Sequence, residues 1–313
     1  MKKDSLIYVA VHEGFIGSAI GGKLKEKGYG NIILRKKNEL NLSDQKAVDS
    51  FFKKTRPEYV FFPPVRTGGI LGNSKYPADF IYQNLISQVN VIYSSFKYGV
   101  KKLLFLASAC CYPKICPQPI KENYLLTGLL ESTSEPYAVA KIVGIKMCQA
   151  YNKQYKANFI SVIPTNIYGP GDDFREEGHV MAGLIKKFYE AGKEGENSEV
   201  RIWGTGKPKR EFIYVDDAAE ACLFLMNNYN NSELINIAGG EEVSVKKLAG
   251  LLGKISGFKG KIIYETEKPD GMLHRKLNSK KIFSLGWRPK VKLKQGLEST
   301  CQFYKKVFKI ENN

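Results

Sequence analysis

The first half of the chain alternates short apolar runs with amphipathic helical segments, and this alternation limits the possible folds more than any other feature. Near-continuous apolar strands are typical of a parallel sheet, because such a sheet is covered by helices on both faces. The pattern therefore predicts an α/β fold with a Rossmann-type doubly wound parallel sheet. The expected strands are 6–11, 31–34, 59–62, 103–108 and 159–163, and the expected helices are 14–27, 44–54, 77–98 and 136–155.

The pattern changes after Pro164, where a turn-rich segment is followed by shorter elements. We expect strands at 200–203, 211–215 and 234–237, with helices at 180–191, 218–228, 245–255 and 293–308. This change predicts two domains. The first is a Rossmann domain at residues 1–168, rejoined by a returning segment at about 211–240, and the second is a smaller, discontinuous α/β lobe at residues 169–313 that would bind the substrate.

The chain is strongly basic, with 48 Lys and Arg against 31 Asp and Glu and a formal charge of +17. The basic residues are mixed with acidic ones along the expected helices, and no groove-reading module is visible. We therefore expect a solvated lysine-rich surface rather than a nucleic-acid partner. The same positive field would attract an anionic nucleotide substrate.

Cysteine and histidine spacing argues against disulfides and metal sites. Six cysteines are scattered without paired CxxC spacing, and the three histidines are far apart, which favours a reducing cytoplasm and no metal. The first apolar run, at 6–11, is too short for the core of a signal peptide, so we expect no export. No apolar run approaches the roughly 20 residues that span a bilayer, so no membrane partner is expected.

Tyr137 and Lys141 stand four residues apart, about thirty residues after Ser108. Residues i and i+4 share a helix face, so the Lys141 ammonium can stabilise the anion of a phenol whose ordinary pKa is about 10. A serine at the end of an apolar strand can hydrogen-bond a substrate carbonyl opposite the tyrosine. The Tyr-x-x-x-Lys spacing alone occurs by chance in many helices. Together with Ser108 and an N-terminal glycine turn, it predicts hydride transfer on a dinucleotide fold.

The glycine turn Val11-His12-Glu13-Gly14-Phe15-Ile16-Gly17 lies between the first expected strand and its helix. A dinucleotide pyrophosphate meets the helix N-terminus at this junction. A complete motif would carry glycine at position 11, and a β-branched residue in the unusual backbone conformation of such a turn costs about 1–3 kcal/mol.

A basic cluster, Arg35-Lys36-Lys37, follows the second expected strand. Cationic groups at this place favour a ribose 2′-phosphate over a free 2′-hydroxyl, which predicts NADP rather than NAD. The alternative is a solvated basic strand end.

Seven longer strings are more specific: YPADFIYQN at 76–84, CYPK at 111–114, EPYAVAK at 135–141, IPTNIYGP at 163–170, WGTG at 203–206, REF at 210–212 and KPDG at 268–271. In order and spacing they resemble the GDP-L-fucose synthase family of extended short-chain dehydrogenase/reductases, from about residue 5 to residue 305. The resemblance implies conversion of GDP-4-keto-6-deoxy-D-mannose to GDP-L-fucose, by epimerisation at C3 and C5 followed by reduction at C4 with NADPH.

The resemblance also implies a role for each catalytic residue. Cys110 would be the base and His179 the acid of the epimerisation, and Tyr137, with Lys141 and Ser108, would serve the reduction. The C4 ketone acidifies the protons on C3 and C5 alike, and a thiol with an ordinary pKa of about 8.5 and an imidazole near 6.5 bracket neutral pH. From sequence alone, Cys110 could also be a small buried residue and His179 an exposed helix-start residue.

The binding residues are likewise implied by the resemblance. The implied NADP(H) contacts are Val11, Gly14, Phe15, Ile16, Gly17, Arg35, Lys37, Asn41, Leu42, Leu106, Ala107, Ser108, Lys141, Pro164, Asn166, Ile167 and His179. The implied substrate contacts are Asn166, Lys187, Trp203, Arg210 and Asp270. Trp203 as a core residue and Arg210 as a surface ion pair are the alternatives. A homodimer through the helices at 77–98 and 136–155 is also implied.

Departures from the family pattern are concentrated in the cofactor half. The family usually has glycine at Val11, arginine at Glu13 and alanines at Pro63 and Pro64. A carboxylate at Glu13 would repel a 2′-phosphate, so these changes bear on cofactor affinity and NADP preference. Two other readings stay open: a reductase or epimerase of another GDP-4-keto sugar, such as a heptose or dideoxy sugar, and a catalytically silent nucleotide-binding protein.

Overall fold

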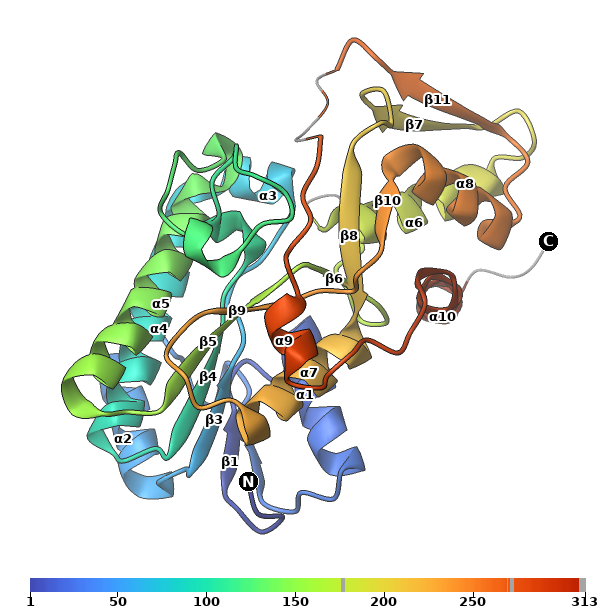
Figure 1. Ribbon diagram of the computed structural model, residues 1–313. Coiled ribbons are helices and arrows are strands. Elements are labelled where there is room, and N and C mark those ends of the chain that lie inside the picture. The colour runs from blue at the N-terminus through green and yellow to red at the C-terminus, as the bar shows by residue number, and fades with distance from the viewer. Residues whose placement is uncertain (176–177, 269, 271–272, 310–313) are drawn as a thin grey trace.

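A computed structural model describes residues 1–175, 178–268, 270 and 273–309. Within these residues, six parallel strands form the central sheet in the order β2-β1-β3-β4-β5-β9 (Figure 1). These strands are β1 Ile7–Val9, β2 Ile32–Leu34, β3 Tyr59–Phe62, β4 Lys102–Leu106, β5 Phe159–Pro164 and β9 Ile235–Ile237. The predicted α/β fold with a parallel Rossmann-type sheet is confirmed.

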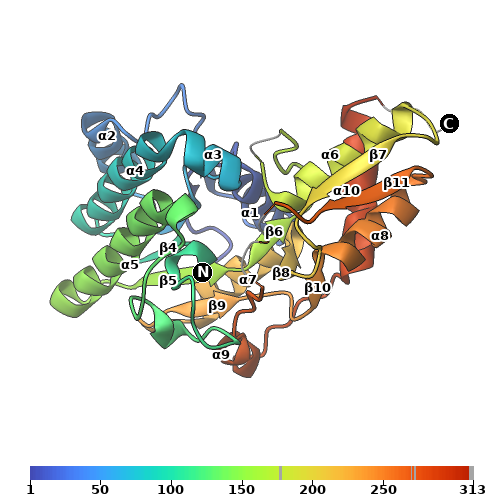
Figure 2. The same cartoon turned by 90° about the horizontal axis from the view of Figure 1, so that it is seen from above.

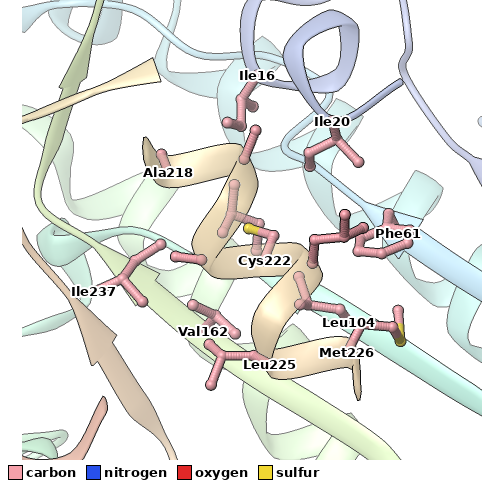
Figure 3. Packing of buried hydrophobic residues seen from close by; sticks show 14 of the residues in the cluster. Ile16, Ile20, Phe61, Leu104, Val162, Ala218, Cys222, Leu225, Met226 and Ile237 are labelled. Carbon is pink, nitrogen blue, oxygen red and sulfur yellow. The ribbon is translucent and has the colours of Figure 1, made fainter. Parts of the chain in front are cut away.

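Helices cover both faces of this sheet, because alternate strand residues point to opposite sides. Ile7 and Val9 join one core with α1 (Phe15–Glu26) and α7 (Val215–Asn228). Figure 3 shows this core, with Cys222 and Leu225 of α7 among strand side chains. Tyr8 joins the opposite core with α2 (Gln45–Thr55), α4 (Pro77–Lys97) and α5 (Glu135–Tyr155).

A second, smaller lobe of strands and helices lies beside the central sheet and its helices, as the view from above shows (Figure 2). The central sheet with its helices is called the first layer, and this lobe the second layer. Its strands are β6 (Asn166–Tyr168), β8 (Lys209–Tyr214) and β10 (Glu242–Ser244) in one sheet, and β7 (Glu199–Trp203) and β11 (Lys261–Glu265) in another. The helices α6 (Val180–Lys193), α8 (Val245–Ser256) and α10 (Leu293–Val307) share a separate hydrophobic core with these strands.

The chain crosses between the two layers more often than the sequence indicated. β8 pairs with β6 and β10 outside the central sheet, and only α7 and β9 return to it. The returning segment expected at 211–240 therefore joins the central sheet only from α7 onward. β6 and β10 were not expected because each is short and begins with a polar residue, whereas the equally short β1 and β2 are wholly apolar. β11 was not expected either.

The remaining elements have six residues or fewer. They are α3 (Ile70–Lys75), α9 (Lys280–Ser284) and the 3-10 helices η1 (Ala109–Cys111), η2 (Glu122–Tyr124) and η3 (Ser132–Ser134). The first strand is shorter than expected, because Val11 has φ of 53° and cannot continue an extended strand. None of the helices in the described ranges is long and apolar enough to cross a membrane.

Candidate active site

The turn after β4 brings a hydroxyl and a thiol to the carboxyl end of the sheet. Ser108 has extended backbone angles and precedes η1, and its Oγ accepts a hydrogen bond from the Cys110 backbone N–H at 3.2 Å. Cys110 is half-buried, whereas Cys111 is buried, with its thiol 3.8 Å from the Ala138 carbonyl oxygen. The turn is thereby attached to α5, and of these two cysteines Cys110 is the one that solvent and ligands can reach.

Tyr137 lies in the first turn of α5, against this turn, and its side chain is 6% exposed. Burial, and then the charges of Cys110 and Cys111, raise the pKa of Tyr137, while a hydrogen bond with the Ser108 side chain lowers it, so that the net direction is upward. The phenol therefore keeps its proton at neutral pH. A protonated Tyr137 beside Ser108 is in the state needed to give a proton to a ketone oxygen.

Lys141 lies one helical turn further along α5 and is buried. Its Nζ is 4.6 Å from the centre of the Phe105 ring, and burial lowers the pKa of Lys141 to about 7. A buried lysine with so low a pKa destabilises the folded state at neutral pH. The sequence placed Tyr137 and Lys141 on one helix face, and the structure adds that this face is inside the protein.

His179 is the N-cap residue of α6, in the second layer. Its Nδ1 lies 2.9 Å from Asp172 Oδ1, and the Asp172 side chain is 2% exposed. Burial lowers the pKa of His179, but the hydrogen bond and charge of Asp172, with a contribution from Asp173, raise it above its usual value on balance. The sequence analysis missed Asp172, because the contact depends on the path of the loop between β6 and α6.

The N-terminus of α1 is shaped for a dinucleotide. Gly14 is the N-cap residue and offers no side-chain cap, so the first backbone N–H groups of the helix are available to a phosphate. A Cβ at Gly17 would collide with the carbonyl oxygen of Val11, so helix and turn pack as closely as only glycine allows. Phe15 and Ile16 form the first turn of this helix. The residues present fit a pyrophosphate.

Two carboxylates occupy the rim beyond β2, where the ribose substituent was expected. Glu13 Oε2 accepts a hydrogen bond from the Lys37 backbone N–H at 2.9 Å, and Glu39 Oε2 accepts one from the Lys36 N–H at 2.8 Å. The Arg35 guanidinium donates to the Leu34 carbonyl oxygen. The basic cluster is therefore accompanied by two exposed carboxylates that a 2′-phosphate would meet.

The other expected cofactor positions lie along the carboxyl edge of the central sheet. Leu106 ends β4, and the Ala107 N–H bonds to the Val162 carbonyl oxygen. Asn41 and Leu42 precede α2, and the Leu42 carbonyl oxygen accepts from the Asn90 side chain. The remaining positions are Pro164 at the end of β5 and Asn166 and Ile167 in β6. Pro63 and Pro64, which follow β3, are buried and half-buried respectively.

Glu211 connects the two layers from a fully buried position. Its carboxylate accepts hydrogen bonds from the backbone N–H groups of Gly240 and Leu277, and its carbonyl oxygen accepts from the Thr165 and Asn166 side chains. Burial raises the pKa of Glu211 to about 7 despite these bonds. These contacts fix Asn166 and, one residue before Glu211, Arg210 on β8.

The other expected substrate residues surround the strands of the second layer. Trp203 is 55% exposed at the end of β7, so the core alternative is wrong for this residue. Lys187 is exposed, and its Nζ donates to the Arg201 carbonyl oxygen at 3.0 Å. Arg210 is half-buried, and its guanidinium donates to the Lys209 carbonyl oxygen.

Asp270 is engaged within the protein. Its two carboxylate oxygens accept hydrogen bonds from the Thr205 N–H at 2.8 Å and the Thr205 hydroxyl at 2.6 Å. Gly204 has φ of 77°, and a Cβ there would collide with the carboxylate. Asp270 thus holds the turn that follows Trp203, while Pro269, Gly271 and Met272 of the same segment lie outside the described residues.

Comparison with known proteins places this site in a family. The sequence profile of the family described as "NAD dependent epimerase/dehydratase family" matches residues 7–238, about three quarters of the chain. The chain belongs to this family. Within it, GDP-L-fucose synthase 1 of Arabidopsis thaliana is 50% identical over 305 residues, 97% of this chain and 94% of that protein.

Two solved structures are similar over nearly the whole chain. A GDP-6-OMe-4-keto-L-xylo-heptose reductase from C. jejuni has a TM-score of 0.92 and 36% identity, covering 98% of this chain and 99% of that one. A GDP-L-fucose synthetase from Naegleria fowleri bound to NADP has a TM-score of 0.90 and 28% identity, covering 100% and 98% respectively. The resemblance to the GDP-L-fucose synthases is confirmed.

Proposed function

We propose that this enzyme converts GDP-4-keto-6-deoxy-D-mannose to GDP-L-fucose, using NADPH. The proposal rests on one observation: residues suited to epimerisation and residues suited to reduction lie side by side. A reachable thiol, Cys110, lies close enough to Tyr137 for its charge to act on the phenol, and Ser108 contacts both residues. An epimerising base and a reducing acid beside one ketone are what the two halves of this reaction require.

Epimerisation needs a base and an acid on opposite faces of the sugar. Cys110 removes the proton from C3 or C5, and the electron pair of the C–H bond moves into the C4 carbonyl, leaving an enolate. His179 returns a proton to the same carbon from the other face, and the carbonyl re-forms. The steps exchange protons only, so no net oxidation or reduction occurs.

Reduction follows at the same carbonyl. The glycine turn at the α1 N-terminus would hold NADPH, which would supply the hydride. Tyr137 holds its proton because it is buried, and gives it to the C4 oxygen, while the Ser108 hydroxyl orients that oxygen. Lys141, one turn away, is positioned to stabilise the phenolate that remains.

The GDP part would occupy the second layer. The exposed Trp203 ring offers a stacking face for a guanine, and Arg210 and Lys187 offer cations for the diphosphate. Asn166 would reach the sugar from β6. Asp270 would act through the Thr205 turn that follows Trp203, and each of its oxygens, which accepts one hydrogen bond from Thr205, has a further lone pair for a substrate donor.

A second candidate is a reductase of another GDP-4-keto sugar. The observation in its favour is the overall similarity to the C. jejuni heptose reductase. A catalytically silent protein is disfavoured, because Tyr137 and Ser108 form a hydrogen bond beside the thiol of Cys110 and the buried Lys141 lies one helical turn from Tyr137.

We also propose a homodimer through α4 and α5. Apolar side chains follow the outer face of α4 at helical spacing, at Tyr82, Ile86, Val89 and Tyr93. α5 packs beside α4 and carries the exposed Tyr155. A second copy related by a two-fold axis would cover this stripe. The six unpaired thiols are consistent with a cytoplasmic location, and the mixed surface charge with the absence of a nucleic-acid partner.

The test is to incubate the purified protein with NADPH and GDP-4-keto-6-deoxy-D-mannose, follow cofactor oxidation, and identify the sugar product. The proposal expects GDP-L-fucose. Turnover of a 4-keto heptose nucleotide with no reaction of the deoxymannose substrate would assign the protein to the second candidate. Size-exclusion chromatography with light scattering tests the dimer, and Tyr93→Glu is expected to give monomers.

A further inference from the structure

Asp172 is a buried carboxylate that the epimerisation described above does not use. It lies in the loop between β6 and α6, where Gly169 and Gly171 have φ of 153° and 87° and turn the chain inward. Its Oδ1 accepts hydrogen bonds from the Asp173 N–H at 2.8 Å and lies 2.9 Å from His179 Nδ1. Its Oδ2 is buried and has no partner among the described groups.

Such a carboxylate is expensive to bury unless a positive charge lies beside it. The neighbouring Asp173 has its own cation, since Arg175 donates to both of its oxygens at 2.8 and 2.7 Å. Lys186 and Glu190 of α6 lie nearby and form an ion pair with each other. The imidazole of His179 is the cation in hydrogen-bond contact with Asp172.

The backbone of His179 is fixed independently of this contact. Its carbonyl oxygen accepts the Gly183 N–H at 2.9 Å, and its side chain makes no helix cap. The ring is therefore oriented by Asp172 rather than by the helix. A proton on Nδ1 points at the carboxylate, which leaves Nε2 as the atom that exchanges protons with a ligand.

We propose that Asp172 is the positioning residue of the epimerisation acid: it holds the His179 ring with Nδ1 protonated and Nε2 directed to the sugar. The inference rests on the proposed function of His179. The increased pKa of His179 has the direction that such a pair requires. Loss of a carboxylate that orients a catalytic imidazole can lower rates by up to about 10⁴-fold.

The first experiment needs no substrate. Nitrogen NMR of labelled protein, assigned with variants of the other two histidines, reports which ring nitrogen of His179 carries the proton and where the ring titrates. The native protein is expected to show the Nδ1–H form. In Asp172→Asn the ring should titrate at lower pH and lose this preference. An Nε2–H form in the native protein, or unchanged titration in the variant, overturns the proposal.

The second experiment measures deuterium uptake at C3 and C5 of the 4-keto sugar without cofactor. Asp172→Asn is expected to slow exchange by about a hundredfold or more. The alkaline limb of its pH–rate profile should also move to lower pH. Asp173→Asn, the matched control in the same loop, should stay within about threefold. Asp172→Ser is the second variant if Asp172→Asn does not fold.

The two experiments separate the possible failures. If the native protein shows no exchange but the NMR result holds, the proposed function fails and the Asp172–His179 pair stands. If Asp172→Asn loses stability while exchange and titration match the native protein, Asp172 only supports the loop and the proposal is wrong.

Discussion

The turn that carries Ser108 and Cys110, here the catalytic turn, lies at the same edge of the central sheet as the cofactor rim formed by Val11, Glu13 and Lys37. The two are built differently. Tyr137 and Lys141 are buried on a long helix, and the half-buried Ser108 forms hydrogen bonds with Tyr137 and with the Cys110 backbone. At the rim, Val11 has a positive φ, and the Glu13 carboxylate accepts a hydrogen bond from the Lys37 backbone N–H. Several contacts fix each catalytic side chain, whereas the cofactor rim carries backbone strain and a negative charge. Substitutions should therefore lower activity in the first region and improve cofactor binding or stability in the second.

The largest effect should come from separating the two chemistries of the catalytic turn. Tyr137→Phe is expected to lower NADPH oxidation by about 10³-fold while leaving deuterium exchange at C3 and C5 nearly intact, because only reduction needs the phenolic proton. Cys110→Ser should instead slow deuterium exchange at C3 and C5. Stopped assays with mass spectrometry of the sugar read both steps. Equal loss of exchange in the two variants would contradict the assigned roles.

The buried ammonium of Lys141 should lower the free energy of unfolding. Lys141→Met is expected to stabilise the protein by about 2 kcal/mol at pH 6.5, because burial of the ammonium is unfavourable there. The folded pKa of Lys141, about 7, lies below the ordinary value, so the penalty is full below pH 7 and fades as pH rises toward 10.5.

Urea unfolding at pH 6.5 and pH 9.5 measures this difference. Lys146→Met, at an exposed position of the same helix, is the control and should change stability little at either pH. If the difference in unfolding free energy between Lys141→Met and the native protein is no smaller at pH 9.5 than at pH 6.5, the lysine is not buried as described.

Removing the carboxylate at the rim should improve cofactor binding. Glu13→Gln keeps an oxygen that can accept the Lys37 N–H but removes the negative charge, so the affinity for NADPH should rise about fivefold to tenfold, or about 1 kcal/mol, with NADH little changed. Calorimetric titration of both cofactors measures this. Glu26→Gln, an exposed carboxylate near the far end of α1, is the control. An equal gain for NADH would point to a general charge effect.

The smallest effect should come from relieving backbone strain. Val11→Gly is expected to stabilise the protein by about 1 kcal/mol, because glycine adopts φ of 53° without the strain of a β-branched residue. Thermal unfolding measures it. Ala10→Gly, one residue earlier and outside the left-handed region, should instead destabilise. If both variants destabilise, Val11 contributes more by packing than it costs in strain.

Much of the central domain could be predicted from the sequence, because its strands lie in apolar runs and its long helices show their period. The helix carrying Tyr137 and Lys141 was expected at 136–155 and spans Glu135–Tyr155. The second layer was harder, since β6 and β10 are short and partly polar, β11 was not expected, and β8 pairs away from the central sheet. Strand pairing over such distances leaves no local signal.

The sequence by itself determined the individual strands of the central sheet, the helix face shared by Tyr137 and Lys141, and the glycines at the α1 N-terminus, because these depend on residues close together in the chain. Only the tertiary structure decided that Asp172 meets His179, that Glu13 reaches the amide of Lys37, and that Asp270 is held by Thr205. Each of these contacts joins loop residues whose directions are set by the packing of whole elements, which a local pattern does not encode.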